Sequence, residues 1–221
     1  MNEVQARDEI CRVGKSLFDR GYVHATAGNI SWRLDDGGFL ITPADACLGF
    51  LDPARLARVD AGGVHTGGDR PSKTLALHAR IVQEARRHDP ATRCVLHTHS
   101  TYCVALSLAS RDAELLAPIT PYFVMKVGRV PHVPYHRPGS AQAVEDVAAL
   151  IRGYAEAGKP IRAAMLNRLG PVVWHESAAA AMAVLEELEE TARLTMIAAG
   201  PLQPLDAAAI EELRASFGAR W

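Results

Sequence analysis

The sequence predicts one α/β domain built on a mixed sheet, and three observations support this prediction. Short apolar runs typical of strands alternate along the chain with longer segments whose apolar residues recur at helical spacing. Hydrophobic residues make up 48% of the 221 residues and charged residues 22%, which is typical of a globular chain with a real core. No internal repeat, low-complexity linker or clear boundary divides the chain, so we expect residues 1–221 to form a single domain.

The N-terminal third predicts one helix followed by short strands. Apolar residues recur at helical spacing over residues 3–19, and Gly21 ends the run. The strand-like runs 30–34 and 38–42 flank an Asp-Asp-Gly turn, which indicates a β-hairpin. A further strand is predicted over 56–60, because turn residues follow it.

The middle of the chain predicts a helix, a buried strand and a second helix. After a loop at 67–71, Ser72 stands where an N-cap is expected, and the apolar spacing predicts a helix over 73–88. Residues 92–99 are predicted to form a buried strand, and a helix is expected over 102–109.

The remainder of the chain repeats this alternation. The segment 123–134 contains two strand-like pieces, and the helix that opens at 138–140 runs to about residue 157. A strand pair is predicted over 163–174, and helices are predicted over 178–197 and 206–217. Because strand pairs separate the helices, we expect a mixed sheet.

Charge and cysteine usage exclude several classes of function. The formal net charge is −1, whereas a nucleic-acid binder usually carries a basic excess, so we expect no nucleic-acid partner. No stretch reaches 18 apolar residues and the charged N-terminus has no apolar signal core, so we expect no membrane association. The four cysteines are scattered without a CxxC pair, which favours a protein of the reducing cytosol.

The strongest local signal is His97-Thr98-His99 at the end of the apolar strand predicted over 92–99. Because strand side chains alternate, residues i and i+2 point to the same face, and two such imidazoles can share a metal ion. Zinc suits neutral nitrogen ligands in a tetrahedral site with one open position. The alternative is a pair of histidines at a solvated strand end.

Two further segments are suited to binding an anion. Gly28 lets backbone N–H groups approach an anion closely, and Asn29 adds a side-chain donor. Ser72 and Lys73 stand at a predicted helix start, where free N–H groups and the helix dipole favour a phosphate or carboxylate. A plain turn and a plain helix cap are the alternative interpretations.

Seven segments appear in an order that resembles the class II aldolase and adducin family. They are Thr26–Ser31, Ile41–Pro43, Pro71–Lys73, His97–His99, Val133–Gly139, Gly170–Val173 and Leu188–Ala192. The resemblance covers nearly the whole chain. Segments 47–53 and 120–125 are most similar to those of members that decarboxylate 3-oxo-tetronate 4-phosphate to dihydroxyacetone phosphate.

The resemblance implies a three-layer α/β/α fold with a mixed, largely antiparallel central sheet. It also implies a homotetramer with active sites between subunits, and a divalent metal that polarises a carbonyl beside the carbon–carbon bond that breaks. Gly28, Asn29, Ser72 and Lys73 match positions that hold the substrate's phosphate in the family.

Three positions depart from the family pattern. Relatives usually carry an acid/base Glu where this chain has Thr74, and a hydroxyl titrates too far above neutral pH to replace a carboxylate as general base. They also supply a third metal-binding His where this chain has Leu169, which coordinates nothing. Asp45 stands where many relatives carry Gly, and it adds a negative charge beside the phosphate site.

By the same resemblance, His136 lies in a stretch that runs towards the active site. We therefore expect His136 to replace the missing third metal ligand beside His97 and His99.

These observations predict a metal-dependent lyase acting on a small phosphorylated keto acid or sugar, with zinc as the expected metal and manganese as the alternative. Lys73 and Thr74 are the expected catalytic positions. Loss of carbon dioxide itself generates the enediolate, so decarboxylation tolerates Thr74 better than aldol cleavage does. Two alternatives stay open: an aldolase of sugar phosphates, which Thr74 disfavours, and an adducin-like binding protein without catalysis, which His97 and His99 disfavour.

Overall fold

A computed structural model describes residues 1–109 and 112–221 and places an eight-stranded sheet at the centre of the molecule. The strand order is β4-β3-β2-β1-β5-β8-β7-β6. The strands are β1 Asn29–Arg33, β2 Phe39–Ile41, β3 Ala57–Val59, β4 His65–Gly67, β5 Cys94–His97, β6 His132–Val133, β7 Ala163–Leu166 and β8 Gly170–His175. Every pairing is antiparallel except that of β6 with β7, which confirms the predicted mixed, largely antiparallel sheet.

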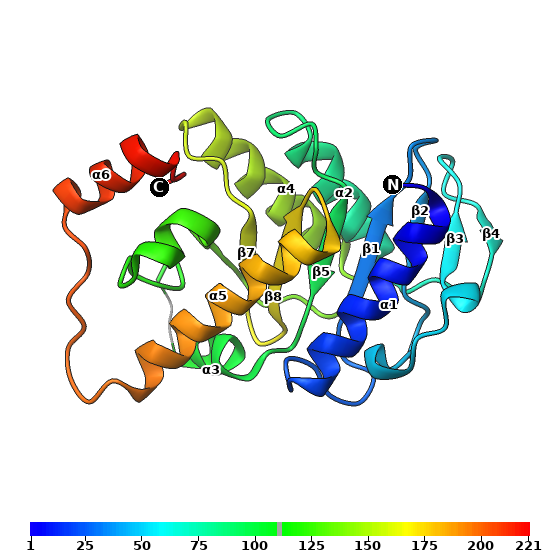
Figure 1. The fold of residues 1–221 in the computed structure, drawn as a ribbon, viewed down its shortest axis with the longest axis horizontal. Helices are drawn as coiled ribbons and strands as arrows, with labels where there is room; N and C mark the ends of the chain where they lie inside the picture. Colours follow the sequence, from blue (N-terminus) through cyan, green and yellow to red (C-terminus); the bar gives the residue numbers. More distant parts are fainter. Residues whose placement is uncertain (110–111) are drawn as a thin grey trace.

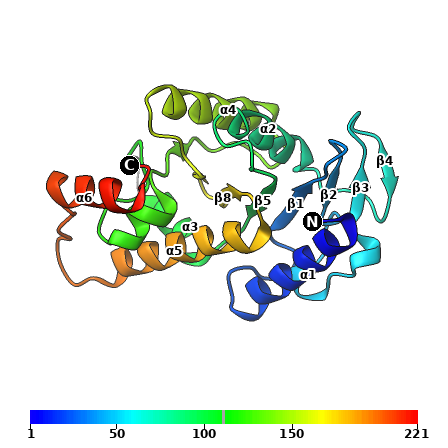
Figure 2. The same ribbon diagram turned by 45° about the horizontal axis from the view of Figure 1, so that its top comes forward.

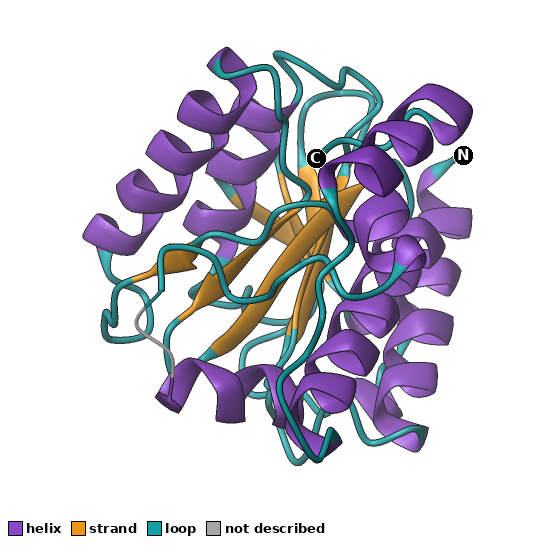
Figure 3. Cartoon of the chain, turned by 90° about the vertical axis from the view of Figure 1, so that its left-hand side faces the viewer, coloured by secondary structure: helices purple, strands orange, loops and turns teal. Residues whose placement is uncertain are grey.

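Helices cover both faces of the sheet and complete the three predicted layers (Figures 1 to 3). The helices are α1 Glu3–Asp19, α2 Leu75–Ala85, α3 Thr101–Ala109, α4 Ala141–Glu156, α5 Ala178–Ile197 and α6 Ala207–Phe217. The cores on the two faces are separate. One packs α1, α3 and α5 against the sheet, and the other packs α2 and α4 against it.

Alternation along β5 decides which face receives the histidines. Cys94 and Leu96 belong to the core under α1 and α5, whereas Val95 belongs to the core under α2 and α4. Because successive side chains point to opposite faces, His97 shares the face of Val95. The end of β5 therefore presents His97 towards α2 and α4.

Most predicted elements are confirmed, but α2 begins later than expected. Its N-cap is Thr74, whose side chain makes no capping hydrogen bond. The Ser72 hydroxyl lies 3.0 Å from that of Thr74. The prediction of Ser72 as N-cap is therefore wrong, because Ser72 pairs with a neighbouring hydroxyl in the loop that precedes the helix.

Two other segments differ from the expectation. Residues 123–127, predicted as a strand, form a π-helical turn (η3), because Phe123 is fully buried and packs edge-on against Trp221 at a centroid distance of 5.8 Å. Tertiary packing overrides local strand propensity here. The short strand β4 was not predicted, since its residues are exposed or half-buried and show no apolar alternation.

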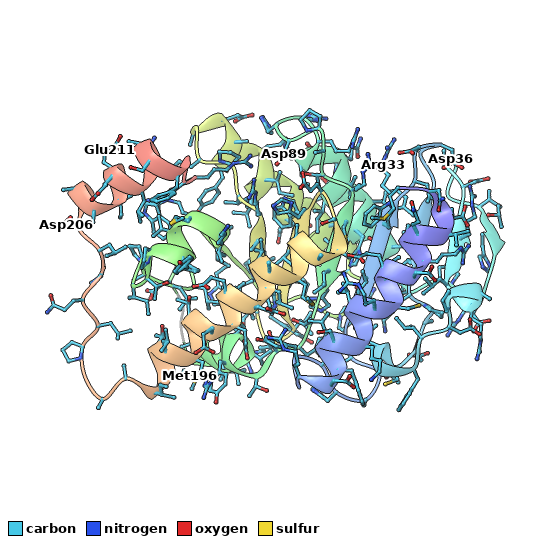
Figure 4. All side chains as sticks on the ribbon, in the orientation of Figure 1. Arg33, Asp36, Asp89, Met196, Asp206 and Glu211 are labelled. Atoms are coloured by element: carbon cyan, nitrogen blue, oxygen red, sulfur yellow. The ribbon has the colours of Figure 1, made fainter. Side chains whose placement is uncertain are left out.

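The C-terminal segment returns to the body of the molecule. Asp206 (Figure 4) caps α6 by accepting a hydrogen bond from the Ala209 backbone N–H at 2.9 Å. Arg220 then lies 3.3 Å from the carboxylate of Asp89. No helix within the described ranges is long and apolar enough to span a bilayer, and the four cysteines are free thiols.

Candidate active site

A cavity of about 250 Å³ opens between the end of β5 and the starts of α2 and α4. Its walls come from the loop before β1, the loop before α2, the His97–His99 segment, the turn before α4, and the turn between β7 and β8. The predicted site residues that line it are Gly28, Asn29, Ser72, Lys73, Thr74, His97 and His99. Seven positions predicted from the sequence thus lie around one space.

His97 is held in a defined orientation at the end of β5. It is 6% exposed, and its Nδ1 lies 2.9 Å from the carbonyl oxygen of Pro171. Because a carbonyl only accepts, Nδ1 carries the hydrogen and Nε2 keeps its lone pair. Burial, together with the neighbouring His99, lowers the pKa of His97 to about 4, so the ring is neutral at neutral pH.

His99 completes a pair of imidazoles. The ring centroids of His97 and His99 are 5.0 Å apart with an interplanar angle of 60°. Burial, and then the charge of His24, lower the pKa of His99 as well. Two imidazoles on one tetrahedral zinc ion have centroids roughly 5 Å apart, given Zn–N distances of about 2.0–2.1 Å. The pair therefore fits a divalent cation as two neutral nitrogen ligands.

Among the described residues, none joins this pair as a third ligand. Within residues 1–109 and 112–221, no group of three or more His, Cys, Asp or Glu side chains is arranged to hold a metal. Leu169 lines the cavity, as its position in the sequence suggested. The ring of His24 lies 6.5 Å from that of His99, too far for both to bind one ion in this arrangement.

His136, expected as the third ligand, is directed elsewhere. Its Nε2 lies 2.7 Å from Oδ2 of Asp146 on α4, and His136 is not among the residues that line the cavity. In this structure the carboxylate of Asp146 is the partner of the His136 imidazole, and the two side chains form a half-buried pair.

The loop before β1 supplies the wall opposite His97. Asn29 pairs with His97 across the β1–β5 ladder. Gly28 has a φ of +86°, and a Cβ there would lie 2.9 Å from the His97 carbonyl oxygen, so only glycine lets the loop approach this closely. Asn29 is 8% exposed, and its Oδ1 has no hydrogen-bond partner among the described residues. Asn29 also lines the cavity.

The start of α2 supplies hydroxyls, a cation and backbone N–H groups. The N–H groups of Thr74 and Leu75 donate to the Ser72 hydroxyl and carbonyl. Those of Ala76 and Leu77, which also line the cavity, have no partner among the described residues. Lys73 is exposed and forms no ion pair with any described residue. Thr74 stands within hydrogen-bonding distance of Ser72 and offers a hydroxyl where relatives were expected to offer a carboxylate.

Two cavity residues were not predicted from the sequence. Arg137 precedes the Pro-Gly turn before α4, and nothing local in the sequence distinguishes it from a surface arginine. His78 lies four residues after Thr74 and therefore on the same face of the helix, and this spacing was the only sequence signal that placed it near the cavity. Its Nδ1 lies 2.8 Å from the Ser31 hydroxyl, its Nε2 has no partner among the described residues, and burial lowers its pKa to about 3.

Two distant contacts hold the His97–His99 segment in place. The carboxylate of Glu189 on α5 accepts hydrogen bonds from the backbone N–H groups of Tyr102 and Cys103 at 2.8 and 2.9 Å. It thereby caps α3, which begins directly after this segment. Gly170 has a φ of +112°, and a Cβ there would lie 2.0 Å from the carbonyl oxygen of Thr98. Any side chain at this position pushes the histidine segment away.

Comparison with known proteins identifies similar sequences and folds. Residues 8–196 match the profile of the Class II Aldolase and Adducin N-terminal domain. The chain is 48% identical to the 3-oxo-tetronate 4-phosphate decarboxylase of Cupriavidus necator over 226 aligned residues, with 99% of each chain covered. It is similar to the crystal structure of YgbL from Escherichia coli, with a TM-score of 0.84, 41% identity, and 96% and 99% of the chains covered. An L-fuculose 1-phosphate aldolase shares the fold, with a TM-score of 0.82, 20% identity, and 97% and 96% covered.

Proposed function

The chain belongs to the class II aldolase and adducin family and is a lyase, and on that premise we propose that it decarboxylates 3-oxo-tetronate 4-phosphate to dihydroxyacetone phosphate. The observation that carries the proposal is the cavity itself. It joins two neutral imidazoles to a cluster of anion-binding groups, in a chain that matches a decarboxylase of this substrate over nearly its full length.

The chemistry of a 3-oxo acid explains why the site can act without a carboxylate base. The bond between C1 and C2 breaks, C1 leaves as carbon dioxide, and its electron pair passes into the C3 carbonyl as an enediolate. A proton added at C2 then completes dihydroxyacetone phosphate. No carbon-bound proton is removed, so the hydroxyl of Thr74 is compatible with the reaction. Aldol cleavage, in contrast, needs a base that takes the proton from the hydroxyl on the carbon that becomes the aldehyde.

His97 and His99 are the proposed metal ligands, and zinc is the proposed metal because both donors are neutral nitrogens. When bound, a divalent cation supplies Lewis-acid stabilisation of the oxyanion that develops on the carbonyl oxygen. The chain's own contribution is orientation. The Pro171 carbonyl holds the His97 ring, and the Gly170–Thr98 contact holds the segment between the two histidines.

The phosphate of the substrate is proposed to bind at the start of α2. Ser72 and Lys73 provide a hydroxyl and a cation there, and the first turn of α2 provides the backbone N–H groups of Ala76 and Leu77, which have no partner among the described residues. The unpartnered amide of Asn29 lies across the cavity wall beside Gly28. Together these groups orient the substrate so that its reacting carbonyl extends towards His97 and His99.

We further propose that the protein is a homotetramer of the cytosol. The exposed apolar side chains of Tyr122, Met196, Ile197 and Phe217 support burial against other subunits (Met196 is labelled in Figure 4). The four free thiols support a reducing compartment. Light scattering on the purified protein measures the subunit count, and a monomeric mass contradicts the assembly.

The decisive assay separates two products. Metal-loaded protein is incubated with 3-oxo-tetronate 4-phosphate and, in parallel, with L-fuculose 1-phosphate, and carbon dioxide and aldehyde release are followed separately. We expect carbon dioxide from the first substrate and little aldehyde from the second. Aldehyde without carbon dioxide favours the aldolase alternative, whereas the absence of both products favours an adducin-like binding protein.

A further inference from the structure

Two side-chain cations line the cavity from different elements. Lys73 lies just before α2, and Arg137 lies in the turn before α4, where the Ser140 backbone N–H donates to the Arg137 carbonyl at 3.1 Å. Neither cation forms an ion pair with any residue in the part of the chain that the structure describes. Both charges are therefore free to meet a ligand.

The packing of α2 against α4 brings Lys73 beside the turn that carries Arg137. These helices lie side by side on one face of the sheet (Figure 2). A Cβ built on Gly139 would lie 3.9 Å from Cδ of Lys73, so the lysine side chain runs along the turn that carries Arg137. Gly139 has a φ of +79°, which allows this tight turn.

Two residues that line the same cavity each hold a buried polar atom without a partner among the described residues. Oδ1 of Asn29, in a residue that is 8% exposed, makes no hydrogen bond within the described residues. The same holds for Nε2 of His78, whose side chain is fully buried. Because unpaired buried polar atoms are costly, these two indicate a polar ligand in the cavity.

The charge of the cavity matches a phosphate. Asp45 is the only acidic residue among the described residues that line it, and its carboxylate lies 3.4 Å from Nη2 of Arg70 outside the cavity. Lys73 and Arg137 then remain as two uncompensated positive charges. A phosphate monoester carries about −1.5 to −2 at neutral pH, so two cations neutralise it.

The chemistry of decarboxylation decides which anionic group the cations hold. The carboxylate loses its charge as carbon dioxide leaves, so an ion pair with it stabilises the ground state and not the transition state. The phosphate keeps its charge throughout the reaction, so ion pairs with it stabilise the ground state and the transition state equally and do not raise the barrier. Cations placed close together therefore suit the phosphate end.

Building on the proposed function, we propose that Arg137 is a specificity-determining residue that binds the substrate's phosphate together with Lys73. The two helix starts then form one clamp, with the N-terminal amides of α2 below it. Such a clamp selects phosphorylated keto acids over unphosphorylated ones, because removal of the phosphate leaves two cations without a partner.

The test is equilibrium binding of inorganic phosphate and of glycerol 3-phosphate, measured by titration calorimetry. Arg137→Ala is expected to weaken both by about tenfold or more, the scale of a lost charged hydrogen bond. Arg137→Lys is expected to recover part of the loss, since it keeps the charge but not the planar fork. Lys126→Ala is the control, because Lys126 is an exposed cation that forms no ion pair with any described residue and does not line this cavity.

Each outcome decides the proposal. Phosphate binding that is unchanged in Arg137→Ala overturns it. Weaker binding of the keto acid with unchanged binding of inorganic phosphate assigns Arg137 to the carboxylate, and also overturns it. The measurement needs no turnover, so weaker phosphate binding in a protein that releases no carbon dioxide supports the clamp while the proposed function fails.

Discussion

Replacing Leu169 by histidine is expected to convert a two-imidazole site into a three-imidazole site. Leu169 lies in the tight turn between β7 and β8, where its backbone N–H donates to the Leu166 carbonyl at 3.0 Å, and its side chain lines the cavity. The next residue, Gly170, packs directly on the Thr98 carbonyl. Position 169 is therefore held beside the His97–His99 segment without any change of backbone.

The expected gain in metal affinity is large and its cost in stability is small. Catalytic zinc sites use three protein ligands, and even the loss of an outer-shell partner costs about 10–100-fold in affinity. We expect a third ligand to tighten zinc binding by at least about 100-fold, roughly 2.7 kcal/mol. Leu169 is half-buried, so the loss of its apolar contacts destabilises the fold by about 1 kcal/mol.

The assay is calorimetric titration of zinc into protein purified without added metal. The same substitution in a His97→Ala background is the control, because the gain depends on the histidine pair and should disappear there. Thermal unfolding of each variant shows that the fold is retained. Zinc affinity that is unchanged in a well-folded Leu169→His variant refutes the reasoning that position 169 reaches the metal.

Four further predictions follow from the same geometry. His97→Ala and His99→Ala should each lower bound metal in elemental analysis, and full occupancy in both variants contradicts their role. Lys73→Ala should raise KM for the phosphorylated substrate through a loss of about 1.5–3 kcal/mol in binding, and an unchanged KM and kcat places the phosphate elsewhere. The pKa of His78 is about 3 in the folded protein and about 6.5 in the unfolded protein. Below pH 6.5 only the unfolded state takes up a proton at this residue, so the folded state is most stable relative to it above pH 6.5 and loses stability as the pH falls. Urea unfolding should show that the free energy of unfolding falls by about 1.4 kcal/mol more in wild type than in His78→Gln when the pH is lowered from 7.5 to 5.5. Equal falls in the two proteins rule out this contribution. Glu189→Gln should lower the free energy of unfolding by about 1.5–3 kcal/mol, because one backbone N–H group on α3 loses its charged acceptor, and an unchanged denaturant midpoint argues against the cap.

Much of the site was predictable because its signals are local. The alternation expected of a strand predicts His97 and His99 on one side, and although β5 ends at His97, the structure finds their rings 5.0 Å apart. The close approach at Gly28 follows from the absence of a side chain in a loop that must meet the backbone of β5. Lys73 and Ser72 stand just before a helix whose period is readable from its apolar residues.

Other features depend on contacts between segments far apart in the chain. Arg137 and Lys73 are 64 positions apart in the sequence. They line the same cavity because α4 packs beside α2. The His136 ring pairs with Asp146, a carboxylate that the packing of α4 places 2.7 Å from its Nε2. Residues 123–127 form a helical turn because Phe123 is buried against Trp221 near the C-terminus.

The sequence by itself determined the α/β class with its mixed sheet, the histidine pair and the glycine loop before β1, since each rests on a period of two or 3.6 residues or on the conformation that glycine allows, whereas the three layers followed from the family resemblance. Only the tertiary structure decided which cations share the cavity, which histidine is drawn away from it, and which carboxylate caps α3. The physical reason is that an ion pair or a cap depends on the distance between side chains in the packed molecule, and sequence separation does not specify that distance.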